Sequence, residues 1–399
     1  MKAEAITSAI LQQIVGIDKR KRVFMIELFS LLLRLRGRVN FCNMARYGKY
    51  IAMCYRANFG RIFPFAKFNK LLIKAHGGSE LLLAFDPCYI SKSGKHTPGV
   101  GYFWSGCAGS VRWGLEVCAL AVLDVENHTA FHYKAMQTVY VKGSGTLREL
   151  YVKMIAEARE GLMELSKIIV LDAFFSKKDF VASLCTMGFT MVSRLQKNSY
   201  MQYQYIDVQK GGRGRPKVYG DKIDPNNVCT KHFNMMYQTQ ETVIYEGIGH
   251  VKGLDKWVKL VIVNMLKEGK VSKYLIYFST DQTMTADKIL EYYKLRFQIE
   301  FLYRDAKQHL GLNHCQSRNK NALDFHFNAV LTTVNIAKVA HWLCIPKIHR
   351  PPFSIADIKT QYTNKYILDK LITIYGKNPE LEKNNPLIQK LYQLGTIAA

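Results

Sequence analysis

The chain has 399 residues, more than a usual single-domain core, so roughly two to four structural units are expected. Lys and Arg total 56 against 31 Asp and Glu, which gives a net charge of +25 and favours a polyanionic partner such as nucleic acid. No apolar run approaches the about 20 residues that a bilayer-spanning helix needs, so a membrane partner is not expected.

Residues 1–78 are predicted to form a helical DNA-binding domain. Apolar residues recur with helical spacing over residues 23–35, a break follows at Gly37, and the helical pattern resumes over residues 44–56. Helix, short break and helix is compatible with a helix-turn-helix, although any small helical domain has such breaks. The first 80 residues carry 15 Lys and Arg against 4 Asp and Glu, and this local excess favours DNA binding over a purely structural role.

The start of the chain and its cysteines indicate a protein of a reducing compartment. Residues 1–6 lack the charged-then-apolar pattern of a secretory signal, so we expect the protein to stay in the cytoplasm. The nine cysteines are odd in number and show no CxxC spacing, which is typical of reduced thiols. His309 and His314 have no Cys pair nearby, so no zinc site is expected.

Residues 79–199 change to strand-like patterning. The predicted elements are strands at 81–90, 100–106, 113–123 and 129–140, a helix at 145–166, a strand at 168–171, a helix at 177–187 and a strand near 190–194. Strands followed by helix, strand, helix and strand is the order of a ribonuclease-H-like fold. The predicted fold class is therefore α/β, and the first part of a catalytic domain occupies this segment.

Two aspartates of this segment are candidate metal ligands. Asp86 closes the apolar run 81–85, and Asp172 closes the run 168–171. Taken alone, an Asp after such a run is more often a strand-end or turn residue, and Asp124 is assigned to a hairpin on that ground. A ribonuclease-H-like site requires two strand-end aspartates followed by a helical glutamate, because neighbouring strands and a crossing helix bring three carboxylates to one point.

Residues 200–285 are predicted to form a β-rich insertion in the catalytic domain. Alternating apolar segments indicate strands, and a basic loop with Arg213 and Arg215 lies near the start. Flexible Arg-Gly-Arg has the shape of an arm that enters a narrow A·T minor groove. An exposed basic loop without specificity accounts for the same sequence equally well.

A helix over about residues 286–310 is predicted to carry one stripe of functional side chains. Tyr293, Arg296, Glu300 and Lys307 have offsets of 0, 3, 7 and 14, which at about 100° per residue fall within a stripe about 60° wide. The apolar residues of the helix lie beside or opposite this stripe: Leu295, Ile299, Leu302 and Ala306. One carboxylate among cations indicates a metal ion together with phosphate.

This string resembles, residue for residue, the Y-x2-R-x3-E-x6-K signature of the DDE transposases of bacterial insertion sequences. The resemblance implies that Asp86, Asp172 and Glu300 are the catalytic acids and metal ligands. It also implies that Tyr293, Arg296 and Lys307 bind terminal DNA phosphates. A β-rich insertion before the glutamate-bearing helix, and cut-and-paste movement, are further features of that family.

The chain after the signature is predicted to close the catalytic domain and to end in a helical tail. Residues 286–345 hold the signature and an apolar helix from 322 to 344, which is expected in the core. Pro346 begins a basic amphipathic tail, residues 346–399. This tail is compatible with a solvated face, with DNA contact or with subunit contact.

The predicted function is metal-dependent cleavage and strand transfer on DNA. Three carboxylates can hold two Mg²⁺ (or Mn²⁺) ions about 3.5–4 Å apart, which serve an attacking water or 3′-hydroxyl and the leaving oxygen. The expected partners are double-stranded DNA at terminal inverted repeats, target DNA and a second copy of the chain. One alternative is a domesticated DNA-binding protein, which the presence of all three acids disfavours; the other is a ribonuclease-H-like nuclease, which does not need the helix signature.

Overall fold

The computed structural model describes residues 2–139, 143, 145–209 and 215–397 as a mixed α/β protein with one large sheet. The twelve strands of this sheet are β1 (Leu81–Ser91), β2 (Gly101–Ser105), β3 (Ser110–Asp124), β4 (Thr129–Gln137), β5 (Ile168–Val170), β6 (Thr190–Arg194), β7 (Met201–Gln204), β8 (Tyr219–Lys222), β9 (Phe233–Gln238), β10 (Thr242–Val251), β11 (Lys256–Lys267) and β12 (Lys270–Ser279). Each strand predicted for residues 81–194 is present within a few residues of its expected bounds.

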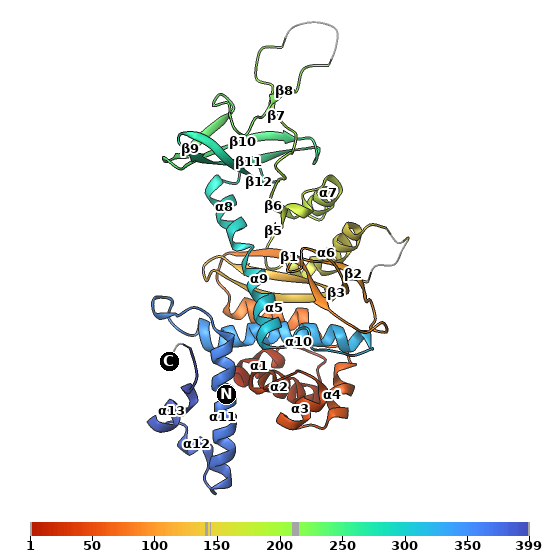
Figure 1. Ribbon diagram of the computed structural model, residues 1–399, viewed down its shortest axis with the longest axis vertical. Coiled ribbons are helices and arrows are strands. Elements are labelled where there is room, and N and C mark those ends of the chain that lie inside the picture. Colours follow the sequence, from red (N-terminus) through yellow and green to blue (C-terminus); the bar gives the residue numbers. More distant parts are fainter. Residues whose placement is uncertain (1, 140–142, 144, 210–214, 398–399) are drawn as a thin grey trace.

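The strand order joins the catalytic part of the chain to the insertion. The sequence of neighbours is β2-β3-β1-β5-β6-β12-β11-β10-β7-β8, with β4 beside β3 and β9 beside β10. β3 is antiparallel to both β1 and β4, whereas β5 and β6 run parallel to β1. Because β12 pairs with β6, the β-rich segment after residue 200 extends the same sheet, as Figure 1 shows.

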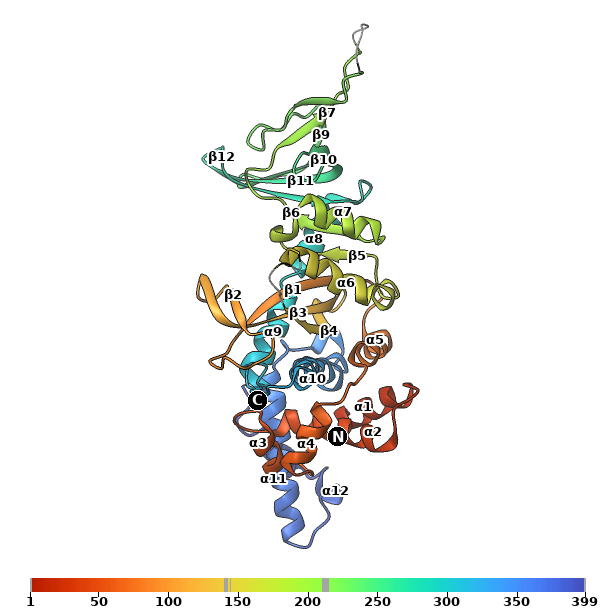
Figure 2. The same cartoon turned by 90° about the vertical axis from the view of Figure 1, so that its right-hand side faces the viewer.

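Helices cover both faces of the part of the sheet that contains β1. On one face α6 (Leu147–Met163) packs its Tyr151 ring against Phe85 of β1, and α7 (Lys178–Thr186) lies beside it. On the other face lie α9 (Gln298–His309) and α10 (Lys320–Lys338) (Figures 1 and 2). Nearly all of α10 is buried, because it lies between the sheet and the N-terminal helices.

The N-terminal segment is helical, as predicted, but has four breaks where the sequence indicated one, at Gly37. Its helices are α1 (Lys2–Gln12), α2 (Lys19–Arg34), α3 (Phe41–Tyr47), α4 (Ala52–Phe59) and α5 (Phe65–His76). One unpredicted break follows α3 at Gly48, where any Cβ would collide with the Tyr55 hydroxyl. The chain therefore turns where only glycine fits.

The last of these helices, α5, packs directly on the sheet. Asn69 of α5 is fully buried, and its amide donates to the carbonyl of Tyr133 in β4 (3.1 Å) and to the hydroxyl of Thr332 in α10 (3.0 Å). Its side-chain oxygen accepts from Asn335 (3.0 Å). Residues 65–76 are thus part of the core that supports the sheet.

The predicted single helix over residues 286–310 was wrong, because the chain forms two helices. α8 (Ala286–Leu295) and α9 are joined by a turn at Arg296 and Phe297. The amide of Ile299 bonds to the carbonyl of Arg296, and that of Glu300 to the carbonyl of Phe297, a tighter spacing than in an α-helix. This turn lets α8 follow β12 and β6 while α9 crosses β1 and β3.

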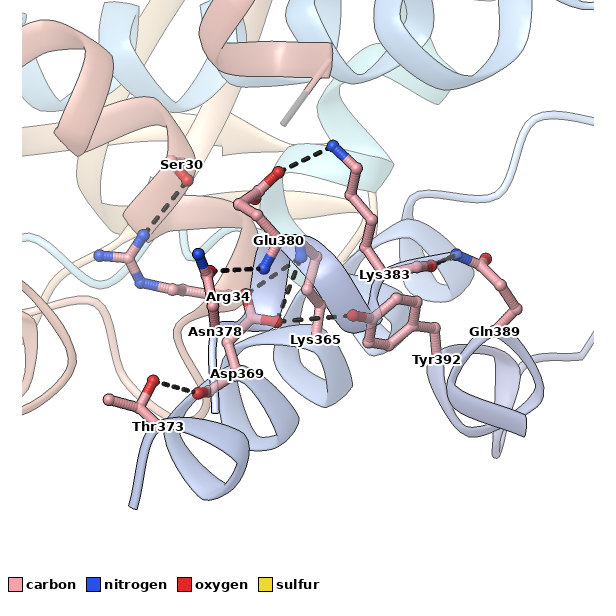
Figure 3. A network of polar contacts seen from close by, with 10 residues as sticks. All are labelled: Ser30, Arg34, Lys365, Asp369, Thr373, Asn378, Glu380, Lys383, Gln389 and Tyr392. Atoms are coloured by element: carbon pink, nitrogen blue, oxygen red, sulfur yellow. Dashed lines mark hydrogen bonds and ion pairs between the residues drawn. The ribbon is translucent and has the colours of Figure 1, made fainter. Parts of the chain in front are cut away.

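The C-terminal tail is helical and docks on the N-terminal helices. It contains α11 (Ile355–Ile374), α12 (Pro379–Glu382) and α13 (Pro386–Gln393). The ammonium of Lys359 donates to the carbonyls of Leu32 (2.8 Å) and Leu35 (2.9 Å) at the end of α2. Figure 3 shows how the Asp369 carboxylate, on α11, accepts from Lys365 and from Tyr392 of α13. Across the described part of the chain, every helix is too short or too polar to cross a membrane.

Candidate active site

The two candidate aspartates lie side by side on adjacent parallel strands. Ala84 of β1 is paired with Val170 of β5, so the same register continued by two residues sets Asp86 beside Asp172. Asp172 follows the last residue pair of β5 and starts the short 3-10 helix Ala173–Phe175. Asp124 instead accepts bonds from the amides of Gly78 and Asn127 in a turn, which confirms its assignment to a hairpin.

The turn between α8 and α9 brings three signature residues to these aspartates. The hydroxyl of Tyr293 donates to Asp172 (3.3 Å), and the guanidinium of Arg296 donates to Glu300 (3.0 Å) and lies over the Tyr293 ring. The Arg296 side chain is 15% exposed and that of Glu300 is 41% exposed. The pair is therefore half open to solvent.

The electrostatics of the site are those of several carboxylates that share one arginine. The pKa of Asp86 is raised to about 7, mainly by burial, while Arg296 opposes the rise and the negative charges of Glu300 and Asp172 add to it. Burial opposes the charge of Arg296, but Asp172, Asp86 and Glu300 outweigh it and raise its pKa. Each of the three acids is thus within electrostatic reach of the same guanidinium.

The donor set fits a hard divalent cation by its chemistry. All three acids offer carboxylate oxygens, the ligands that Mg²⁺ takes in proteins, and a divalent charge would relieve the repulsion that raises the pKa of Asp86. Within the described ranges, no three His, Cys, Asp or Glu side chains are close enough to hold one ion as they stand. Glu300 is instead paired with Arg296.

A tyrosine that the sequence analysis did not select is built into the β1–β3 ladder at Asp86. The hydroxyl of Tyr303, on α9, donates to the carbonyl of Asp86 (2.6 Å) and accepts from the amide of Ala119 (2.7 Å). Asp86 and Ala119 are opposite residues of β1 and β3, so the hydroxyl takes the place of a direct backbone bond. Its only sequence signal is a tyrosine among buried apolar positions, three residues after Glu300.

Glu116 is a second residue that sequence analysis missed. It lies on β3, is almost fully buried, and accepts bonds from the hydroxyls of Tyr151 (2.6 Å) and Thr138 (2.8 Å). Burial raises the pKa of Glu116 against these two bonds, and its charge contributes to the raised pKa of Asp86. An acid in the middle of an apolar strand was the available signal.

The remaining predicted DNA contacts are spread over the molecule. Lys307 lies on α9 with Glu300, seven residues further along, and donates to the carbonyl of Tyr89 on β1 (2.9 Å). Arg215 is exposed between β7 and β8. β8 is seven strands from β1, roughly 34 Å at about 4.8 Å per strand. Arg213 lies outside the described residues.

Comparison with known proteins identifies the family. The model of the transposase DDE domain matches residues 126–336, just over half of the chain, so the chain belongs to this family. The matched span contains Asp172 and Glu300, whereas Asp86 precedes it. The protein is thus a DDE transposase, a metal-dependent DNA-cleaving enzyme.

Two further comparisons add little detail. The cryo-EM structure of the piggyBac transposase synaptic complex with hairpin DNA is similar over 93% of this chain and 78% of that chain, with 11% identity and a TM-score of 0.39. A comparison with curated proteins gives no match.

Proposed function

We propose that this transposase cleaves DNA at the ends of an insertion sequence and joins the cut strands to target DNA. Asp86, Asp172 and Glu300 are the proposed catalytic acids. The observation that carries the proposal is that Asp86 and Asp172 end up on adjacent strands, with Glu300 of α9 paired to the one guanidinium whose charge all three acids share. Phosphoryl transfer needs mainly positioning and charge stabilisation from a protein, which such a site offers.

We also infer that the catalytic part is ribonuclease-H-like. The order β4-β3-β1-β5-β6 supports this, because three antiparallel strands are followed by two that run parallel to the first. The strands β7 to β12 then form the insertion of residues 200–285, and α9 and α10 close the catalytic domain within residues 286–345.

Asp86, Asp172 and Glu300 are the proposed ligands of two Mg²⁺ (or Mn²⁺) ions. Such ions, when bound, activate the attacking water or 3′-hydroxyl and stabilise the leaving oxygen. Glu300 would exchange its bond with Arg296 for the metal, and the freed guanidinium would bind a DNA phosphate through two parallel bonds. The hydroxyl of Tyr293 holds Asp172 in place during this exchange.

The N-terminal helices α1 to α4 are the proposed reader of the terminal inverted repeats. A groove of about 840 Å³ at the start of α2 is lined by Lys19, Arg20, Lys21 and Arg61. The pKa of Lys21 is lowered to about 8, mainly by burial and in part by repulsion from Arg61. A DNA phosphate in this groove would relieve that repulsion, which supports a backbone contact here. Because α5 packs on the sheet, the boundary of the DNA-binding unit is proposed before α5 rather than at residue 78.

The C-terminal tail supports a homodimer in the DNA complex. Two of its helices expose apolar side chains at i, i+4 and i+7, the spacing of a helix face made for packing. These residues are Ile367, Leu371 and Ile374 of α11, Leu387 and Leu391 of α13, and Leu394 directly after α13. Residues 354–397 carry six Lys against four Asp and Glu, so the tail has little of the charge that would repel a second copy.

The test replaces each acid by its amide and follows cleavage and joining with Mg²⁺. Asp86→Asn, Asp172→Asn and Glu300→Gln should each abolish cleavage while end binding persists, because a ligand charge is lost without a change of volume. Asp221→Asn, an exposed acid on β8, makes the same change of charge far from the site and should cleave normally.

Three outcomes separate the candidate functions. An acid variant with wild-type cleavage removes that residue from the site. Cleavage without joining to a second DNA identifies a nuclease, and binding without cleavage by the wild type identifies a domesticated DNA-binding protein.

A further inference from the structure

The β2–β3 ribbon exposes an aromatic face that no other element covers in the described structure. We infer that this face stacks on unpaired bases of the DNA next to the cut, an inference that rests on the proposed function. The face consists of Tyr102 and Trp104 of β2 and Val111 and Trp113 of β3, and is called the aromatic face below. Tyr102 is 72% exposed, Trp104 61% and Val111 56%.

The pairing of the ribbon puts these four side chains on one surface. Tyr102 is opposite Trp113, with ring centroids 5.2 Å apart, and Trp104 is opposite Val111. The residues between them, such as Phe103, point to the other side, where Phe103 is nearly buried. Large aromatic side chains on the open side of the ribbon are costly to leave in water, which indicates that a partner covers them.

The aromatic face is on the same side of the sheet as the catalytic acid. β3 runs without a register shift from its pairs with β2 to its pairs with β1, where Ala119 is opposite Asp86. Trp113 and Ala119 are an even number of residues apart, so their side chains point to the same face. Their separation of six residues spans about 20 Å, equal to about six base steps of DNA.

The charge around the ribbon favours DNA over a second copy of this basic chain. Residues 87–115 contain Lys92, Lys95 and Arg112 and no Asp or Glu. A polar groove of about 260 Å³ beside the end of β1 is lined by Lys92, Lys95 and Arg318, among other residues. Cations can hold the backbone while aromatic rings stack on bases, which is how proteins bind single strands without reading their sequence.

Occupancy by unpaired bases rather than intact duplex follows from the shape of the face. The Tyr102 and Trp113 rings are steeply inclined to each other, at 69°, so each exposed ring offers its own face to one base, and only unstacked bases have a free face to offer in return. Cutting frees strand ends at the site, and base pairs at a free end open easily. The aromatic face would therefore hold the strand beside the cut and not the terminal repeat sequence.

The test compares two labelled DNAs with full-length protein: a blunt duplex and the same duplex with a short oligothymidine extension. Trp104→Ala and Tyr102→Ala should each weaken binding of the extended duplex by about five- to a hundredfold, since stacking of one base is worth about 1–3 kcal/mol. Binding of the blunt duplex should stay unchanged. The salt dependence should also stay unchanged in Trp104→Ala, whereas Lys95→Ala, at an exposed cation of the polar groove, should lower the slope by about one unit.

Controls exclude trivial causes. Tyr375→Ala removes another ring that is 75% exposed, at the end of α11, and should bind both DNAs normally. Trp104→Phe should restore most of the affinity, because it keeps an aromatic ring. Urea unfolding of each variant should match the wild type, since Trp104 is exposed.

The outcomes that overturn the inference differ from those that overturn the proposed function. If the wild type cleaves DNA but Trp104→Ala and Tyr102→Ala bind the extended duplex equally well, only the aromatic-face assignment fails. If the free wild type sediments as a dimer that Trp104→Ala dissociates, the face is a subunit contact and the assignment also fails. If the wild type binds neither DNA, both the proposed function and the assignment fail.

Discussion

Tyr303→Phe should uncouple the catalytic acid from the helix that carries Glu300. The Tyr303 hydroxyl bridges the Asp86 carbonyl and the Ala119 amide, and Ala119 is fully buried. Removal of the hydroxyl leaves the Asp86 carbonyl and the Ala119 amide without a partner, unless β1 and β3 move together and bond directly. Each buried unpaired group costs about 1–3 kcal/mol, so a free-energy loss of about 2–4 kcal/mol is expected after partial closure.

Activity should fall more than the loss of stability explains. Closure of the gap moves Asp86 relative to Asp172 and Glu300, and a shift of about 1 Å in a catalytic group costs on the order of a hundredfold in rate. The assays are urea unfolding and Mg²⁺-dependent DNA cleavage under conditions where the variant is folded. The Mg²⁺ concentration for half-maximal cleavage should also rise, a change that a purely structural tyrosine would not cause.

A matched control is Tyr274→Phe, which removes a hydroxyl that donates to the Lys197 carbonyl (3.1 Å) at the surface. Its unfolding free energy should change by less than about 1 kcal/mol, because water replaces the bond. The reasoning is refuted if Tyr303→Phe has wild-type stability together with wild-type Mg²⁺ dependence.

Three other predictions concern the charge, the core and the pH dependence. Arg296→Ala should tighten Mg²⁺ binding, measured by calorimetry, because it removes a cation that competes for Glu300. The same variant should lower the salt slope of DNA binding by about one unit. Unchanged values for both would contradict the assigned role. Asn69→Ala should lower the unfolding free energy by about 2–4 kcal/mol, since three buried hydrogen bonds are lost. Deletion of residues 1–76 should leave no cooperative unfolding transition. A deletion protein that unfolds cooperatively would show that α5 is dispensable. Burial lowers the pKa of His132 to about 3, so the unfolded chain binds a proton below about pH 6.5 that the folded chain does not. The His132 contribution to stability should be constant above that pH and fall by up to about 1.4 kcal/mol per pH unit as pH falls toward 5, so the unfolding free energies of wild type and His132→Asn, measured with urea, should differ by an amount that changes with this slope.

Local patterns of the sequence were sufficient for the elements and for the family. The strands from residue 81 to 194 were predictable because alternation and apolar runs are local properties of the chain. Asp86 and Asp172 were found because each follows such a run, and Glu300 because its neighbours Tyr293 and Arg296 form a recognisable signature. The family model that matches residues 126–336 confirms the transposase assignment. The catalytic roles of the three acids stay predictions.

The helix over residues 286–310 shows where local reasoning ended. Helical spacing continued through Arg296, and nothing local signalled a turn there, because both Arg296 and Phe297 keep helical backbone angles. The turn is required by the different directions of α8 and α9 across the sheet, which depend on the packing of residues distant in sequence.

The sequence by itself determined the order of strands and helices, the choice of the three candidate acids and the positive net charge of the chain, because composition and periodicity are the same in any conformation. Only the tertiary structure decided that Tyr303 enters the ladder at Asp86, that Arg296 pairs with Glu300, and that α5 belongs to the core. Each of these depends on contacts between residues far apart in the chain. Such contacts are selected by burial and by the need to pair buried polar groups, and neither condition can be evaluated until the chain has folded.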